Sequence, residues 1–168
     1  MIVEIRSETA ADARKIEAVT IAAFLSAPHT SHTEHYIVTA LRRAGALAFS
    51  LVAEADGTVI GHVALSPVSI RDATSGWFGL GPVSVLPQHQ RRGVGSKLVR
   101  EALRILSERG ASGCVVLGEP GYYGRFGFKA DPYLVLPGVP PQFFQAIAFD
   151  SSQPRGIVTY HEAFEARS

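Results

Sequence analysis

The feature that most limits the fold is the junction of a strand-like run and a helix-like run at residues 88–100, which read QHQRRGVGSKLVR. Before it, residues 77–86 are mostly apolar or small, as in a buried strand. After it, apolar residues recur at the spacing of one helix face, at Val94, Leu98, Ala102 and Ile105. An amphipathic helix that follows a buried strand must cover a sheet face, so the chain is predicted to layer helices on a sheet.

Turn and periodicity signals extend this prediction along the chain. The Asp56-Gly57 pair lies between two strand-like runs and predicts a β-hairpin. Gly81-Pro82 interrupts a strand, and because proline donates no backbone hydrogen bond we expect a bulge or a local loss of pairing there. The expected strands cover residues 2–6, 47–55, 59–70, 77–86, 113–117, 143–149 and 156–160. The first expected helix starts within residues 7–12 and is stopped by Ala27-Pro28, and the others cover residues 34–43 and 94–109, with a helical turn after Glu119. The predicted fold class is α/β (α+β), with a mixed sheet flanked by helices.

Composition and charge fit one globular domain over residues 1–168. The formal net charge is +1, which gives no strong attraction to nucleic acid or to a membrane surface. The single cysteine, Cys114, lies in an apolar run, so we expect a buried thiol in a reducing compartment. No basic-then-apolar signal segment and no apolar run of about 20 residues is found. We therefore expect a cytoplasmic protein without a membrane partner.

The glycines and arginines of the junction indicate a site that binds an anion. The first N–H groups of a helix lack partners inside the helix, and the helix dipole adds partial positive charge there. Gly93 and Gly95 allow close approach to the backbone, and Arg91 and Arg92 add countercharge. The stretch is not a P-loop, and Leu98 replaces the third glycine of a dinucleotide fingerprint. It fits either another kind of phosphate site or a tight turn with solvated arginines.

Two segments resemble the GCN5-related N-acetyltransferase (GNAT) family. The stretch LGPVSVLP at residues 80–87, followed by QRRGVG at residues 90–95, is similar to the family's acyl-CoA motif, Gln/Arg-x-x-Gly-x-Gly/Ala. Downstream, GYYGRFGF at residues 121–128 resembles the family's short helix with its Tyr-x-x-x-Gly-Phe ending. The order and spacing of the segments fit, and the resemblance extends from the first strand to about Phe128.

The resemblance implies a mostly antiparallel sheet and an acetyl-CoA site. The two central strands would splay apart beside Gly81-Pro82 and open a slot for the thioester. The pantetheine arm would pair with the backbone of residues 83–85, and the amides of residues 91–96 would hold the pyrophosphate. The cofactor-binding residues that it implies are Val83, Ser84, Val85, Gln90, Arg91, Arg92, Gly93, Val94, Gly95 and Ser96.

Direct acetyl transfer to an amine requires loss of an ammonium proton and a proton donor for the leaving thiolate. The resemblance assigns the donor role to Tyr123, whereas Tyr122 is expected to pack. Many relatives carry a glutamate on the central strand, but residues 77–86 contain no carboxylate. We expect His62, Glu119 or a chain of waters to take the ammonium proton instead. A buried Cys114 would exclude a covalent cysteine route.

The predicted function is acetyl-CoA-dependent N-acetylation of a small-molecule or peptide amine. We expect no metal and no nucleic-acid partner. The sequence leaves open whether the chain forms a homodimer. Two alternatives remain. One is a transferase that uses a longer acyl-CoA or a hydroxyl acceptor. The other is a non-catalytic module that binds acyl-CoA as a sensor or partner domain. His29, His32 and His35 have no partner cysteines, so we expect them in a loop that lines the acceptor site rather than in a metal centre.

Overall fold

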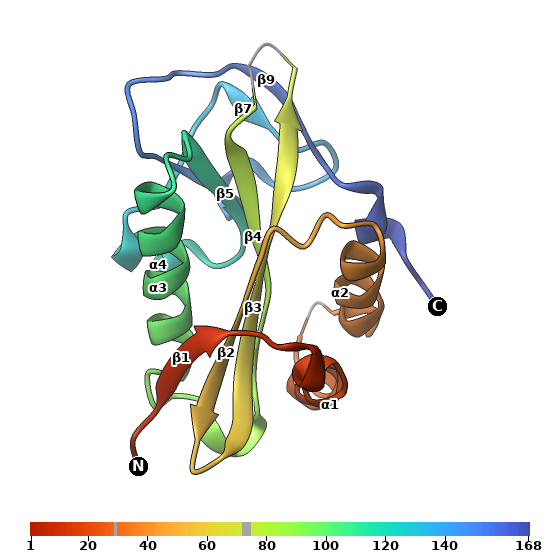
Figure 1. The fold of residues 1–168 in the computed structure, drawn as a ribbon. Helices are drawn as coiled ribbons and strands as arrows, with labels where there is room; N and C mark the ends of the chain where they lie inside the picture. The colour runs from red at the N-terminus through yellow and green to blue at the C-terminus, as the bar shows by residue number, and fades with distance from the viewer. Residues whose placement is uncertain (29, 72–74) are drawn as a thin grey trace.

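The computed structural model describes residues 1–28, 30–71 and 75–168, and it places one sheet between two groups of helices (Figure 1). The helices are α1 (Ala13–Phe24), α2 (Glu34–Arg43), α3 (Val94–Glu108) and α4 (Pro120–Tyr123). The strands are β1 (Glu4–Ser7), β2 (Phe49–Ala55), β3 (Thr58–Ile70), β4 (Trp77–Val85), β5 (Gly113–Leu117), β6 (Lys129–Ala130), β7 (Leu134–Val135), β8 (Phe144–Ala148) and β9 (Gly156–Tyr160). Short 3₁₀ helices are η1 (Ala10–Asp12), η2 (Pro87–His89), η3 (Gly124–Phe126), η4 (Pro141–Phe143) and η5 (Glu162–Glu165).

The predicted order of elements is confirmed, and α2, β5 and β9 have the predicted bounds. The two-residue strands β6 and β7 were not predicted, because so short a strand carries no periodic pattern. In the described part of the chain the strand order is β1-β2-β3-β4-β5-β8-β6, with β9 pairing both β3 and β7. The β4–β5 and β7–β9 pairs are parallel and the others antiparallel, which confirms a mixed, mostly antiparallel sheet.

Strands β4 and β5 are paired at only one end. Their ladder joins Trp77–Gly79 to Gly113–Val115 and then stops. Beyond Gly79, β4 remains paired with β3, but no strand of the described residues pairs with its other edge. The predicted splay between the two central strands is therefore present.

The predicted bulge in β4 accompanies this splay. Leu65 pairs with Leu80 and Val63 pairs with Val83, so Gly81 and Pro82 stand opposite a single residue of β3. Gly81 has a φ of 137°, in the region that favours glycine, and the Gly81–Pro82 peptide is cis. The extra residue bends β4 away from β5 at the point where their pairing ends.

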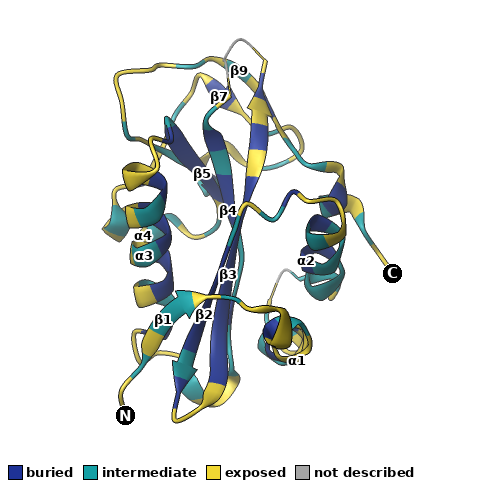
Figure 2. Cartoon of the chain, in the orientation of Figure 1, coloured by how far each residue is buried: buried dark blue, intermediate teal, exposed yellow. Residues whose placement is uncertain are grey.

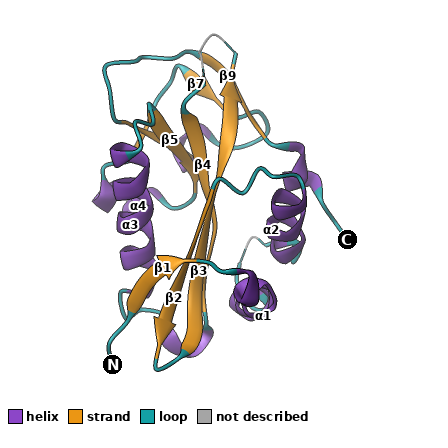
Figure 3. Ribbon diagram, in the orientation of Figure 1, coloured by secondary structure: helices purple, strands orange, loops and turns teal. Residues whose placement is uncertain are grey.

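Helices cover both faces of the sheet (Figure 3). Helix α3 buries one face against the sheet and leaves the other to solvent, as the colours of Figure 2 show. Burial of Leu98 and of Leu106 on that face stabilises the folded state by roughly 1.5–3 kcal/mol each. On the opposite face, Ile16 and Val19 of α1 pack with Val52 of β2. No helix of the described residues is long and apolar enough to cross a bilayer.

Candidate active site

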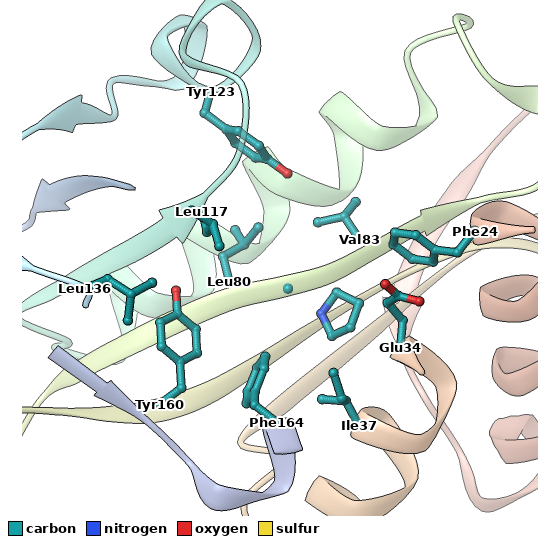
Figure 4. Close-up of a pocket in the computed structure, with 12 residues that line it drawn as sticks. Phe24, Glu34, Ile37, Leu80, Val83, Leu117, Tyr123, Leu136, Tyr160 and Phe164 are labelled. Carbon is teal, nitrogen blue, oxygen red and sulfur yellow. The ribbon is translucent and has the colours of Figure 1, made fainter. Parts of the chain in front are cut away.

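The splay opens into a cavity of about 430 Å³ that is lined from both sides of the sheet (Figure 4). Residues 80–83 of β4, which include the bulge, form its floor, and Leu117 at the end of β5 forms a wall. Helices α1 and α2 contribute Phe24 and Glu34. The cavity therefore exists because β4 and β5 separate where the sheet would otherwise be continuous.

Tyr123, the predicted proton donor, lines this cavity from α4, and its hydroxyl points into it in Figure 4. Gly118 makes room for the ring, because a Cβ at that position would lie 2.4 Å from Tyr123 Cε2. The ring also packs edge-on against Phe128, with 5.9 Å between centroids. Burial raises the pKa of Tyr123 to about 12, so the phenol carries its proton at neutral pH.

Glu34, at the start of α2, is a cavity residue that sequence reasoning missed. Its Oε2 accepts hydrogen bonds from Thr30 Oγ1 at 2.6 Å and from the Ser31 backbone N–H at 3.3 Å. In the sequence, an acidic residue in the first turn of a helix is an ordinary helix-dipole feature. Only the packing of α2 against α1 and η5 places it at the cavity.

Tyr160 and Phe164 close the cavity from the C-terminal part of the chain and were also missed. Tyr160 fits because Gly79 has no side chain, since a Cβ there would lie 2.7 Å from the Tyr160 ring. Burial raises the pKa of the Tyr160 hydroxyl well above its usual value. The alternation of β9 was visible in the sequence, but its pairing with the far end of β3 was not.

A second cavity, of about 350 Å³, lies where α3 begins. The predicted cofactor-binding residues that line it are Val85, Gln90, Arg91, Gly93, Gly95 and Ser96. The lining is completed by His89 of η2 and by Tyr122 and Arg125 of the α4–η3 segment, although Tyr122 was expected only to pack. Arg125 lies over the Tyr122 ring at 4.6 Å and donates a hydrogen bond to Ser96 Oγ at 3.1 Å. We call this group of residues the anion seat.

The backbone of the anion seat is shaped for an anion. Arg91 and Gly93 both have positive φ, 63° and 83°, which turns successive amides toward one side. The first intrahelical hydrogen bond of α3 runs from the Lys97 N–H to the Gly93 carbonyl, so the N–H groups of residues 94–96 precede it. A Cβ on Gly95 would lie 2.9 Å from the Tyr122 hydroxyl oxygen, so a side chain there would fill the seat. These features fit a diphosphate.

The free edge of β4 leads from the anion seat to the splay cavity. The Leu86 N–H donates to the Ile60 carbonyl of β3, and backbone groups alternate in direction along a strand. The N–H and C=O groups of Val83 and Val85 therefore point away from β3. Gln90 Nε2 donates to the Val85 carbonyl at 3.0 Å, which agrees with that direction. The Val83 groups are left to pair with an extended chain such as a pantetheine arm.

The other predicted cofactor-binding side chains lie elsewhere. Ser84 is 1% exposed and its Oγ donates to Thr20 Oγ1 of α1 at 3.5 Å. The Val94 side chain is in the core under α3, and Arg92 is exposed outside the lining of the anion seat. For Val94 only the backbone amide is available to an anion.

The two candidate bases are not brought to the splay cavity. His62 is 0% exposed on β3, and its Nε2 lies 2.7 Å from Ser50 Oγ. Ser50 in turn donates to Glu8, which pairs with Arg42. Burial lowers the pKa of His62 to about 4, but neither His62 nor Glu119 lines the cavity. Glu119 is exposed, and its backbone caps α4.

His29, His32 and His35 were expected to line the acceptor site, and Cys114 was expected to be buried. His29 lies outside the described residues, and His32 and His35 line a small cavity that shares Glu34 and Phe24 with the splay cavity. No group of three or more metal-ligating side chains comes together in the described part of the chain. Cys114 is 0% exposed, as predicted, and burial raises the pKa of its thiol.

Comparisons with known proteins agree with this arrangement. The family model for an acetyltransferase (GNAT) domain matches residues 4–130. An uncharacterized N-acetyltransferase, YhbS, of Escherichia coli K12 is 37% identical over 156 residues, which cover 89% of this chain and 93% of YhbS. The crystal structure of a GNAT family acetyltransferase from Brucella melitensis in complex with acetyl-CoA is 51% identical, with a TM-score of 0.87 over 97% of this chain and 98% of that one. The structure of E. coli YhbS in complex with CoA is 34% identical, with a TM-score of 0.88 over 99% of this chain and 93% of that one. The chain belongs to the GNAT family of acetyltransferases.

Proposed function

We propose that this protein transfers the acetyl group of acetyl-CoA directly to a primary amine. The observation that carries the proposal is the continuity of the two cavities along one strand. Val85 of β4 lines the anion seat, and Val83 of the same strand lines the splay cavity. A ligand with a diphosphate at one end and a reactive group at the end of an extended arm fits this layout.

The chain's own groups would hold acetyl-CoA at three places. The amides of residues 94–96 and the Arg125 guanidinium would bind the diphosphate. The outward backbone groups of Val83 would pair with the arm. Bound acetyl-CoA would supply an acetyl group activated as a thioester. The Brucella melitensis relative is described in complex with acetyl-CoA and YhbS in complex with CoA, which supports this assignment.

Tyr123 is the proposed donor to the leaving sulfur. Its pKa of about 12 lies above that of a thiol, about 8.5, so complete proton transfer from the phenol is uphill. Tyr123 therefore stabilises the developing thiolate chiefly as a hydrogen-bond donor. Backbone N–H groups on the free edge of β4 would stabilise negative charge on the acetyl carbonyl oxygen. Because His62 and Glu119 lie outside the cavity, the proposed proton path from the amine runs through water.

Replacing Arg125 by Gln tests the anion seat. Removal of a charge-assisted contact should raise the Kd for acetyl-CoA roughly 10-fold in isothermal titration. Arg109→Gln is the matched control, because this arginine lies over Phe49 and outside the lining of the seat. Equal affinities of the two variants for acetyl-CoA would show that the diphosphate does not bind at this position.

The reaction is tested by release of free CoA thiol with a panel of amines and alcohols. The proposal expects release with a primary amine and an acetamide product by mass spectrometry. Binding of acetyl-CoA without release for any acceptor would instead favour a non-catalytic module. Faster turnover of a longer acyl-CoA, or of an alcohol, would favour the other alternative.

A further inference from the structure

The side of the splay cavity that α1 and α2 line holds a carboxylate oxygen for which the described residues provide no hydrogen-bond partner. Glu34 Oε1 is buried, and none of the described residues forms a hydrogen bond with it. Its other oxygen, Oε2, is fixed by Thr30 and Ser31. A buried carboxylate oxygen without a donor is costly, which points to a donor that arrives with a ligand. One oxygen thus anchors the side chain and the other is left for that ligand.

The walls around Glu34 are apolar. Phe24 and Ile37 line the cavity on the helical side and Phe164 closes it from η5 (Figure 4). The Tyr160 hydroxyl is a second buried polar atom without a hydrogen-bond partner among the described residues. Of the lining residues, all of which lie in the described part of the chain, Glu34 alone carries a formal charge. The cavity therefore combines a single negative charge with an apolar surround.

We infer that the acceptor is a primary amine with one cationic group and an apolar body, such as an arylalkylamine, and that Glu34 binds its ammonium group. This inference rests on the proposed function. A charge-assisted hydrogen bond to Oε1 would satisfy the unpaired oxygen, and Phe24, Ile37 and Phe164 would bury the apolar body. The cavity volume of about 430 Å³ suits a small molecule of this kind.

The same lining disfavours two other classes of amine. A polyamine would bring further ammonium groups into the cavity, and each buried charge would need a carboxylate partner. The described lining offers no carboxylate beyond Glu34. An amino acid brings a carboxylate that needs a cation, and the described lining contains no Lys or Arg. The reaction is unchanged: the N–C bond forms, the C–S bond breaks, and of the two protons that the ammonium loses one reaches sulfur and one reaches solvent.

The test compares phenethylamine, spermidine and lysine as acceptors for the wild-type protein and Glu34→Gln. Phenethylamine should give the highest kcat/KM. In Glu34→Gln its KM should rise roughly 10-fold to 100-fold, because a hydrogen bond to a charged group is lost. The Kd for acetyl-CoA should stay within about twofold. A second readout is calorimetric binding of phenethylamine to the CoA-saturated protein, which the variant should lose.

Glu162→Gln is the matched control, because Glu162 is exposed on η5 and changes the net charge equally without lining the cavity. Its KM for phenethylamine should equal that of the wild type. Preference for spermidine or lysine, or an unchanged KM and unchanged amine binding in Glu34→Gln, would overturn this inference and leave the proposed function standing. If acetyl-CoA binds but no amine is acetylated, the proposed function fails, while loss of phenethylamine binding in Glu34→Gln would still support the assignment of Glu34.

Discussion

At the scale of single residues, Tyr123 shows how burial can prepare a group for one task. The ring fills space that Gly118 leaves open, and the hydroxyl reaches the splay cavity. Because burial raises the pKa to about 12, the donor form persists across the pH range in which an amine can be assayed. The same residue thus supports the packing of α4 and, under the proposed function, donates a hydrogen bond to the leaving sulfur.

Tyr123→Phe should lower kcat roughly 100-fold, the usual effect of removing one hydrogen-bond donor from a developing negative charge, because only the hydroxyl is lost and the ring still packs. The KM for acetyl-CoA should change less than about twofold. Tyr133→Phe, at an exposed position, removes the same group elsewhere and should leave kcat unchanged. Steady-state kinetics that give equal kcat values for the two variants would exclude Tyr123 as the donor.

At the scale of elements, the splay depends on the closed end of the β4–β5 ladder. Trp77 pairs with Gly113 there, and the indole occupies the space where a Cβ of Gly113 would lie, 2.3 Å from Trp77 Cη2. This contact holds the strands together at one end while the bulge at Gly81-Pro82 separates them at the other. The position of the cavity follows from this pairing more than from any catalytic side chain.

Gly113→Ala should therefore destabilise the protein by about 2–3 kcal/mol, because the buried indole must move from a well-packed site. The melting temperature should fall by roughly 4–10 °C in calorimetry. Gly124→Ala is the control, since a Cβ there meets nothing within 4 Å and the φ of −58° suits any residue. Equal melting temperatures for the two variants would show that the indole contact does not limit stability.

At the scale of the whole molecule, a partly buried polar network ties the N-terminal segment to the sheet and to α2. His62 of β3 contacts Ser50 of β2, which donates to Glu8 beyond β1, and Glu8 pairs with Arg42 of α2 at 2.9 Å. His62 Nδ1 has no hydrogen-bond partner among the described residues. This network joins segments far apart in sequence, and its protonation state affects the stability of the entire fold.

The network predicts a loss of stability in mild acid. The unfolded chain protonates His62 near pH 6.5, whereas burial lowers the folded pKa to about 4, so below pH 6.5 the unfolded state binds more protons. The free energy of unfolding should fall by about 3 kcal/mol between pH 6.5 and pH 4 through this group. In denaturant titrations, the free energy of unfolding should depend less on pH in His62→Gln than in the wild type. His32→Gln, a control at an exposed position, should show the wild-type dependence. Equal slopes for all three proteins would contradict the prediction.

The sequence by itself determined the order of the elements, the bulge in β4 and the glycine turn at the start of α3. Apolar periodicity, Asp56-Gly57 and Gly81-Pro82 act locally, and the glycines of residues 93–95 need only their own backbone to expose amides. The motifs therefore indicated the acetyltransferase family before any packing was known.

Only the tertiary structure decided which side chains face the splay cavity. Glu34, Tyr160 and Phe164 come from α2, β9 and η5, which reach the cavity through the pairing of β9 with β3 and the packing of α2 against α1 and η5. The same packing buried His62 in a network of its own and left Glu119 in solvent, although both looked available in the sequence. Local patterns fix strands and helices because their forces act over a few residues, whereas the contents of a cavity depend on how distant elements meet.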